Sequence, residues 1–251
     1  MAQTISKSGR RGTKVPGHGC HPIRPKGHNL VSSGRTDETQ RVVSALLAKH
    51  GRTYCDELAI SIARNTPSVL FRWLCATMLF SARINAKTAI AASMALTRQG
   101  WTSARRMAAS TWEERTHVLN GAGYARYDES TSTKLGEAAD LLLDRYDGDL
   151  RRLREEAGGD AGNEHRLIQQ FKGIGPVGAD IFCREMQVAW PELYPFVDAV
   201  ALDTARQLKI GDTARNLATL VERDDFPRLV AALVRTHLAG DYDEVKRQAV
   251  A

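Results

Sequence analysis

Helical periodicity runs through nearly all of the chain from residue 37 onward and constrains its fold more than any other feature. Apolar residues recur at the spacing of an amphipathic helix, as in the face formed by Val42, Val43, Leu46 and Leu47. No segment has the alternation of apolar and polar residues that is typical of a strand. We therefore expect an all-α globule of about ten helices joined by short turns.

Capping residues mark several of the expected helix ends. Thr66 and Pro67 fit the N-cap and the first helical position, and the apolar residues of 65–82 nearly encircle the axis. This helix is therefore expected to lie buried at the centre. Thr111 and Glu114 have the spacing of a capping box.

The positive charge of the chain is concentrated at the N-terminus. Residues 1–36 contain seven lysines and arginines and no acid, and because the whole chain carries +6, residues 37–251 sum to 6 − 7 = −1. Gly, Ser, Pro and His are frequent in this segment and periodicity is absent, so we predict a disordered basic arm. Such an arm can bind phosphates without sequence preference, or act only as a solubilising tail.

Histidine and cysteine usage gives no strong metal or disulfide signal. The arm holds His18, Cys20, His21 and His28, but isolated ligands in a flexible tail predict no metal site. The other cysteines, Cys55, Cys75 and Cys183, are widely scattered, which favours free thiols.

The composition is that of a soluble protein. No apolar run is long enough for a membrane span, and the basic N-terminus lacks the apolar core of a secretory signal. We expect a monomer without membrane contact, located in the cytoplasm and associated with the bacterial nucleoid.

The stretch "FKGIGPVGADIF", residues 171–182, joins two helical patterns through two glycines. Gly173 and Gly175 can adopt positive φ, so the chain can reverse within a few residues, and Pro176 suits the first position of the next helix. Ile174 would plug the turn into the protein. Free amides at the start of the second helix would then form an anion site that can bind a backbone phosphate without reading bases. An ordinary turn between two helices is the alternative.

This stretch resembles the helix-hairpin-helix motif of the endonuclease III-like DNA glycosylase superfamily. The family follows its hairpin with a hydrophobic residue and an aspartate at a helix start, and Val197 and Asp198 in "PFVDAVALDTARQL" resemble that pair. Upstream, "LCATMLFSARINAKTAIAA" and "LNGAGYARYDES" resemble two further family segments. Together the pieces occur in family order over roughly residues 66–210.

The resemblance implies a domain organisation and an activity. It implies two helical lobes within 37–251, with the hairpin at 166–190. The activity it implies is that of a DNA-repair glycosylase, which flips a damaged or mispaired base out of double-stranded DNA and hydrolyses the N-glycosidic bond of that base. The residues expected to contact the DNA backbone lie in the hairpin: Lys172, Gly173, Ile174, Gly175 and Val177.

Departures from the family pattern argue against lyase activity and against an iron–sulfur cluster. Val177 stands where bifunctional members have the lysine that attacks the sugar, and valine is not a nucleophile. No cysteine follows Cys183, so the four-cysteine iron–sulfur loop of the family is absent. We therefore expect a monofunctional enzyme with no cofactor. Lys172 replaces the family proline and Arg83 the family glutamine.

Asp198 is the candidate catalytic residue. A carboxylate beside the sugar C1′ can stabilise an oxocarbenium-like transition state or activate water. A helix N-cap is the alternative role for Asp198, the two roles are compatible, and Asp203 is the reserve candidate.

Four further residues are candidates for base recognition. Tyr124 and Tyr127 could line the pocket of the flipped base, or only pack a loop. Arg83 and Asn85 could probe the duplex, or form a charged surface turn.

Two other functions stay open: a non-catalytic hairpin DNA-binding protein, and a glycosylase with lyase activity that uses another lysine.

Overall fold

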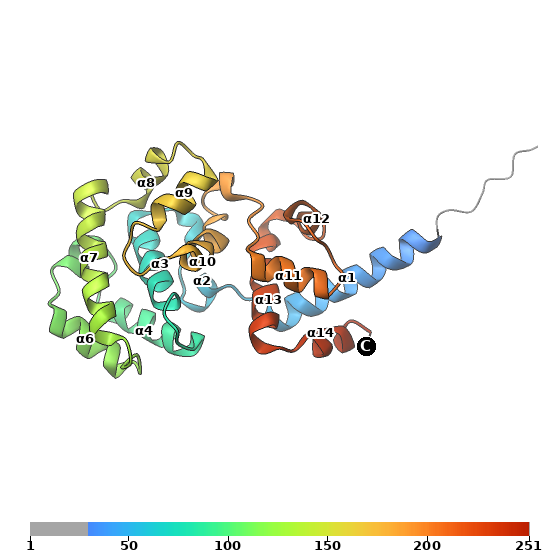
Figure 1. Ribbon diagram of the computed structural model, residues 1–251, viewed down its shortest axis with the longest axis horizontal. Helices are drawn as coiled ribbons and strands as arrows, with labels where there is room; N and C mark the ends of the chain where they lie inside the picture. Colours follow the sequence, from blue (N-terminus) through green and yellow to red (C-terminus); the bar gives the residue numbers. More distant parts are fainter. Residues whose placement is uncertain (1–29, 251) are drawn as a thin grey trace, which may run out of the picture.

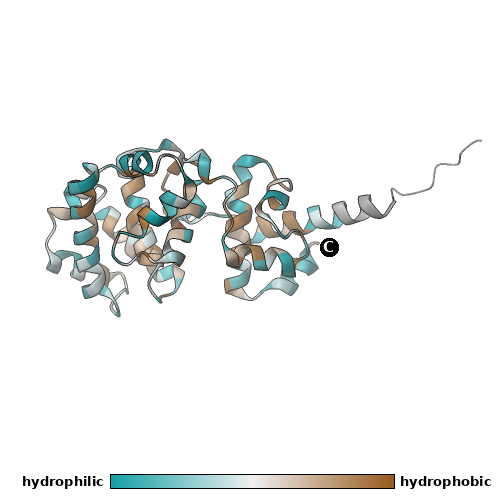
Figure 2. Ribbon diagram, turned by 45° about the horizontal axis from the view of Figure 1, so that its top comes forward, coloured by the Kyte–Doolittle hydropathy of each residue, from teal (hydrophilic) through white to brown (hydrophobic). Residues whose placement is uncertain are grey.

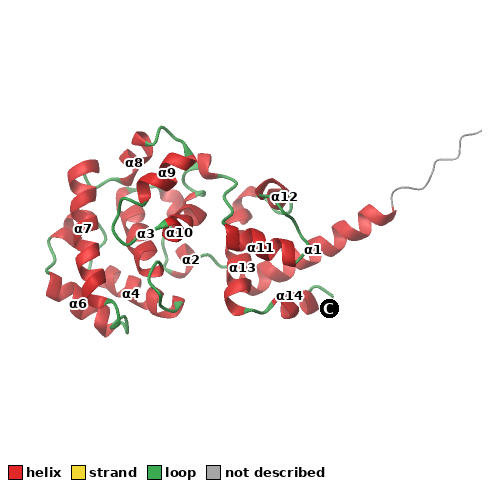
Figure 3. Ribbon diagram, in the orientation of Figure 1, coloured by secondary structure: helices red, strands yellow, loops and turns green. Residues whose placement is uncertain are grey.

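The computed structural model describes residues 30–250, and the side chains of residues 37–250. Every regular element in this part of the chain is helical, with fourteen α-helices and three short 3-10 helices, and it contains no strand (Figure 3). The prediction of an all-α fold is confirmed. The helices outnumber the expected ten because some are about one turn long, and such segments carry too little periodicity to be recognised in a sequence.

Two clusters of buried apolar residues divide the helices into two lobes (Figure 1). The large lobe contains the elements between residues 54 and 193: α2 (Tyr54–Glu57), η1 (Ile62–Arg64), α3 (Pro67–Phe80), α4 (Ala86–Arg98), α5 (Ala104–Ala108), α6 (Trp112–Gly121), α7 (Asp128–Tyr146), α8 (Leu150–Glu156), α9 (Ala161–Ile168), α10 (Pro176–Met186) and η2 (Pro191–Leu193).

The small lobe combines the first helix of the described chain with its last four. Its elements are α1 (Leu30–His50), α11 (Ala199–Gln207), α12 (Ala214–Ala218), η3 (Arg223–Asp225), α13 (Phe226–Ala239) and α14 (Tyr242–Gln248). Helix α13 packs against both α1 and α11. Figure 2 shows that apolar residues occur in the helices of both lobes.

Of the predicted basic arm, residues 1–29 lie outside the described residues, together with its histidines and Cys20. Helix α1 begins at Leu30, so residues 30–36 belong to that helix. Figure 1 shows the N-terminal end of α1 extending beyond the other helices of the small lobe.

Helix α3 forms the centre of the large lobe, as its nearly continuous apolar surface predicts. Leu70, Phe71, Trp73 and Leu74 are fully buried. The indole Nε1 of Trp73 donates a hydrogen bond to the carbonyl oxygen of Phe182 at 3.2 Å. Helix α10, the second helix of the hairpin, is thereby held against the central helix.

The two lobes are joined by contacts around α2. The Arg235 guanidinium of α13 lies 4.3 Å from the ring centroid of Tyr54 and forms a 2.8 Å ion pair with Glu57. From the other side, the buried Glu185 carboxylate of α10 accepts the Tyr54 backbone N–H at 2.9 Å. Burial raises the pKa of Glu185. Helices α10 and α13 therefore both bind α2, which fixes the small lobe beside the hairpin helix.

Candidate nucleic-acid interface

The turn between α9 and α10 has a buried anchor and an exposed rim. Ile174 is 3% exposed, and its N–H donates to the Phe171 carbonyl oxygen at 3.0 Å, so its side chain holds the turn in the core as predicted. Gly173 adopts φ +95°, a conformation that favours glycine. Gly175 instead is extended, with φ −92°, and caps α10 without a side chain. Only one of the two glycines therefore uses positive φ.

Three backbone amides at the turn have no hydrogen-bond partner: those of the exposed Gly175 and Val177 and that of the buried Gly178. Within the described chain, these three N–H groups donate no hydrogen bond. The next N–H along the helix, that of Ala179, donates to the Gly175 carbonyl oxygen at 2.9 Å. A Cβ added at Gly175 would meet no atom within 4 Å. A helix start with unbonded amides and an unobstructed approach favours an anion.

Helix α10 meets the end of α3 at Gly178, a contact that the sequence does not reveal. A Cβ at Gly178 would lie 2.5 Å from Ser81 Oγ and 3.0 Å from Ile174 Cγ2. Only a residue without a side chain allows this approach. The contact brings the "FSAR" segment, residues 80–83, beside the hairpin.

Val177 and Arg184 lie on one face of α10, since a spacing of seven residues corresponds to two turns, about 10 Å along the axis. Val177 is 71% exposed, and Arg184 is buried. The same face therefore leads from the open rim of the hairpin to a buried cation.

That buried cation binds the predicted catalytic residue. Arg184 Nε and Nη2 donate to Asp198 Oδ2 at 2.8 and 2.6 Å, and the two side chains are 8% and 3% exposed. Asp198 Oδ1 accepts the Ala201 N–H at 3.0 Å, so Asp198 is the N-cap of α11. In this structure Asp198 joins α10 to α11 and has little contact with solvent. The reserve candidate Asp203 is exposed and bonds Gln207.

The connection between the lobes is fastened beside this pair. The Gln187 side chain accepts the Phe196 N–H at 3.1 Å and donates to the Phe196 carbonyl oxygen at 3.3 Å. The segment that leads from α10 to Asp198 is thus bound to α10 at two points. Neither Arg184 nor Gln187 belongs to a motif that the sequence marks.

The lysine of the hairpin is already engaged. Lys172 Nζ forms a 2.7 Å ion pair with Glu137 of α7, and the Lys172 side chain is 69% exposed. A surface pair of this kind contributes little stability, so a phosphate can replace the carboxylate.

The four candidates for base recognition occupy different environments. Tyr124 is fully buried and donates its hydroxyl to the Leu79 carbonyl oxygen at 3.0 Å, and burial raises its pKa to about 12. It therefore packs the core and presents no surface to a base, which corrects its predicted place in the pocket. Tyr127 is half-buried with the Arg126 guanidinium 5.3 Å from its ring centroid. Arg83 and Asn85 are exposed, and Asn85 caps α4 by accepting the Thr88 N–H at 2.8 Å.

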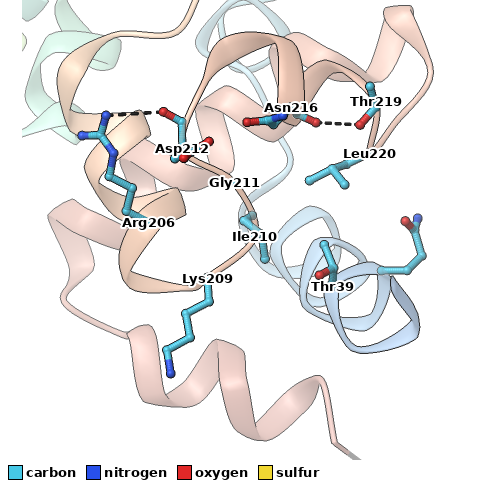
Figure 4. A pocket seen from close by; sticks show the side chains of 10 residues that line it. Thr39, Arg206, Lys209, Ile210, Gly211, Asp212, Asn216, Thr219 and Leu220 are labelled. Carbon is cyan, nitrogen blue, oxygen red and sulfur yellow. Dashed lines mark hydrogen bonds between the residues drawn. The ribbon is translucent and has the colours of Figure 1, made fainter. Parts of the chain in front are cut away.

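A separate hollow of about 820 Å³ lies in the small lobe (Figure 4). Its walls come from α1 on one side and from α12 and the α11–α12 connection on the other. The Arg206 guanidinium donates to the Asp212 carbonyl oxygen at 3.4 Å, whereas the Lys209 side chain points away from Asp212. None of the ten lining residues is aromatic. None of the predicted site residues lines it, and it lacks the stacking surface that a flipped base requires.

Metal-ligating side chains do not gather in the described part of the chain, where no group of three His, Cys, Asp or Glu residues could hold an ion. No helix between residues 30 and 250 combines the length and apolar character needed to cross a bilayer.

No protein-family model matches the chain, and no curated protein matches it. Among solved structures, the chain is similar to endonuclease III trapped in a covalent intermediate with DNA. The two share 15% sequence identity with a TM-score of 0.44, and the match covers 66% of this chain and 73% of that one. A likeness at this level does not assign a function to this chain.

Proposed function

We propose that the chain is a monofunctional DNA glycosylase that binds double-stranded DNA through the α9–α10 hairpin. The observation that carries the proposal is the set of unbonded amides at Gly175, Val177 and Gly178, at the start of α10. The same helix carries Arg184, which binds Asp198. Amides of this kind bind a backbone phosphate and position the duplex without reading its sequence.

The proposed chemistry is hydrolysis of the N-glycosidic bond. The bond between the sugar C1′ and the base breaks, the base leaves with a proton, and water adds to C1′. Asp198 would stabilise the positive charge that develops on the sugar or accept a proton from that water. Val177 offers no amine, so no Schiff base forms at this position and the strand stays intact.

The proposal requires the Asp198 carboxylate to become accessible when DNA is bound. Oδ1 accepts one hydrogen bond and can accept a second, whereas Oδ2 already accepts two from Arg184. Opening between α10 and α11 would uncover the carboxylate for the sugar.

A non-catalytic DNA-binding protein is the second candidate, and the Arg184–Asp198 pair favours it. A buried carboxylate that caps a helix and binds a guanidinium at 2.6 Å has a structural role sufficient to explain its presence. In that case the hairpin would bind DNA and no base would be released.

A panel of duplexes, each with one damaged or mismatched base, separates these functions. We expect base release from at least one lesion, with strand breakage only after alkali treatment, because an abasic site is then the product. Borohydride should trap no covalent complex on abasic DNA. Trapping would instead identify a lyase that uses another lysine, and binding without release from any lesion would favour the non-catalytic protein.

The predicted basic arm has its own test. Because α1 begins at Leu30, deletion of residues 1–29 removes six of the seven basic residues of the arm and leaves the helix complete. We expect a flatter dependence of duplex affinity on salt, by up to about one log unit of slope for each lost phosphate contact. An unchanged slope would mean that the arm does not contact DNA.

A further inference from the structure

The side chain of Lys134, from α7, lies across the hairpin turn. A Cβ built at Gly173 would lie 3.0 Å from Lys134 Cδ, 3.8 Å from Cε and 3.9 Å from Cγ. The aliphatic stem of the lysine therefore covers the face that Gly173 leaves bare. Glycine is required here both for its φ of +95° and for the space that Lys134 occupies.

The ammonium group of Lys134 is uncommitted. Within residues 37–250, Lys134 forms no ion pair and no side-chain hydrogen bond, while the acid one turn further along α7, Glu137, pairs with Lys172 at 2.7 Å. Packing of a stem on a glycine needs only methylenes, so it does not account for a charged end. The free cation lies beside the turn with no acid bound to it.

The ammonium lies within reach of an anion on the hairpin rim. Nζ is one bond beyond Cε, which itself passes close to Gly173. Gly175, the first residue with an open amide, is two positions further along, at most about 7 Å away for an extended chain. A phosphate held by the amides could therefore bind Nζ as well.

We propose that Lys134 is a DNA-binding residue that supplies the cation of the hairpin phosphate site. This inference rests on the proposed binding of DNA. Helix α7 thus forms part of the interface, with Lys134 on the phosphate and Glu137 restraining Lys172 until DNA binds. Gly173 has a further role, because it leaves the space in which the aliphatic part of the Lys134 side chain packs. No feature of the hairpin motif indicates this role.

The test measures binding of a lesion-free duplex by fluorescence anisotropy at several salt concentrations, using the full chain and Lys134→Gln. We expect a 5- to 10-fold loss of affinity at low salt and a decrease of about 0.9 in the slope of log K against log salt, the value for one lost phosphate contact. Lys246→Gln, at an exposed lysine on α14 of the small lobe, is the matched control and should leave the slope unchanged.

Glu137→Gln provides an independent measurement with the opposite sign. It releases Lys172 and removes a negative charge from the interface, so duplex affinity should rise about threefold or more at low salt. If Lys134→Gln binds with the slope of the wild type, the inference about Lys134 is overturned while hairpin binding stands. If the wild type itself binds no duplex, the proposed function and the inference both fail.

Discussion

Replacement of Asp198 by asparagine is expected to reduce base release by a factor of at least about 10³, with duplex binding retained. Asparagine can still cap α11, but it carries no negative charge for the oxocarbenium-like sugar and accepts no proton from water. The measurement is single-turnover base release on the preferred lesion, beside anisotropy with the same duplex. Release at the wild-type rate would assign Asp198 a capping role alone.

The same substitution also leaves Arg184 buried without its partner. Removing one member of a buried ion pair costs about 3–5 kcal/mol, because the remaining charge loses its compensation. Urea unfolding of Asp198→Asn should show a loss of this size. Activity is therefore compared per folded molecule, at a temperature where the variant is fully folded.

Two variants at Arg184 separate the catalytic role of Asp198 from its structural role. Arg184→Met should lose similar stability yet keep measurable base release, because the carboxylate of Asp198 remains. The double variant Arg184→Met/Asp198→Asn removes both charges, so it should recover much of the stability while staying inactive. Equal activity of the two single variants per folded molecule would contradict a catalytic Asp198.

Local features of the structure follow from the sequence because caps act over a few residues. The capping box of Thr111 and Glu114 is present, with both reciprocal hydrogen bonds formed. Thr66 is the N-cap residue and Pro67 the first residue of α3, although the Thr66 side chain forms no capping hydrogen bond. Ile174 is buried beneath the turn as its place between two glycines predicts. Each prediction needed only neighbours within one or two helical turns.

The partners of the candidate site could not be predicted, because they meet through tertiary packing. Arg184 and Asp198 come from different helices, and nothing in their spacing marks them as a pair. Lys134 reaches Gly173 only through the packing of α7 against the hairpin. The sequence leaves two roles open for Tyr124 for the same reason: a tyrosine in a glycine-rich turn can face solvent or core, and here its hydroxyl bonds the Leu79 carbonyl oxygen inside the core.

The first helix of the hairpin contains a buried acid that has no role in the proposed chemistry. Glu164 of α9 is 1% exposed, and within the described chain neither carboxylate oxygen has a hydrogen-bond partner. Burial, with the nearby Glu192 carboxylate, raises the pKa of Glu164 to about 8. Burial raises the pKa of Glu192, but the hydrogen bonds that Glu192 accepts and the charge of Arg154 together outweigh burial and hold this pKa at about 2. The pair thus retains one proton at neutral pH.

Stability is therefore expected to fall as pH rises from about 4.5 to about 8. The unfolded chain releases the Glu164 proton near its ordinary pKa of 4.5, whereas the folded chain keeps it up to about 8. A raised folded pKa gives stability that is complete below 4.5 and is lost as pH rises through 8. Glu192 has the opposite sign, and its contribution is lost only as pH falls from 4.5 toward 2.

Glu164→Gln should remove this pH dependence, because glutamine does not titrate. At pH 8 the variant should be more stable than the wild type by about 4 kcal/mol, because the pKa difference between 4.5 and about 8 corresponds to about 1.4 kcal/mol per unit and is almost fully expressed at pH 8. At pH 4.5 the two should be similar. Urea unfolding at pH 4.5, 6.5 and 8 measures the difference, with Glu129→Gln on the exposed surface of α7 as the control. Parallel stability profiles for the wild type and Glu164→Gln would show that Glu164 is ionised in the folded chain at neutral pH, and the acid beneath the hairpin would then need a partner cation.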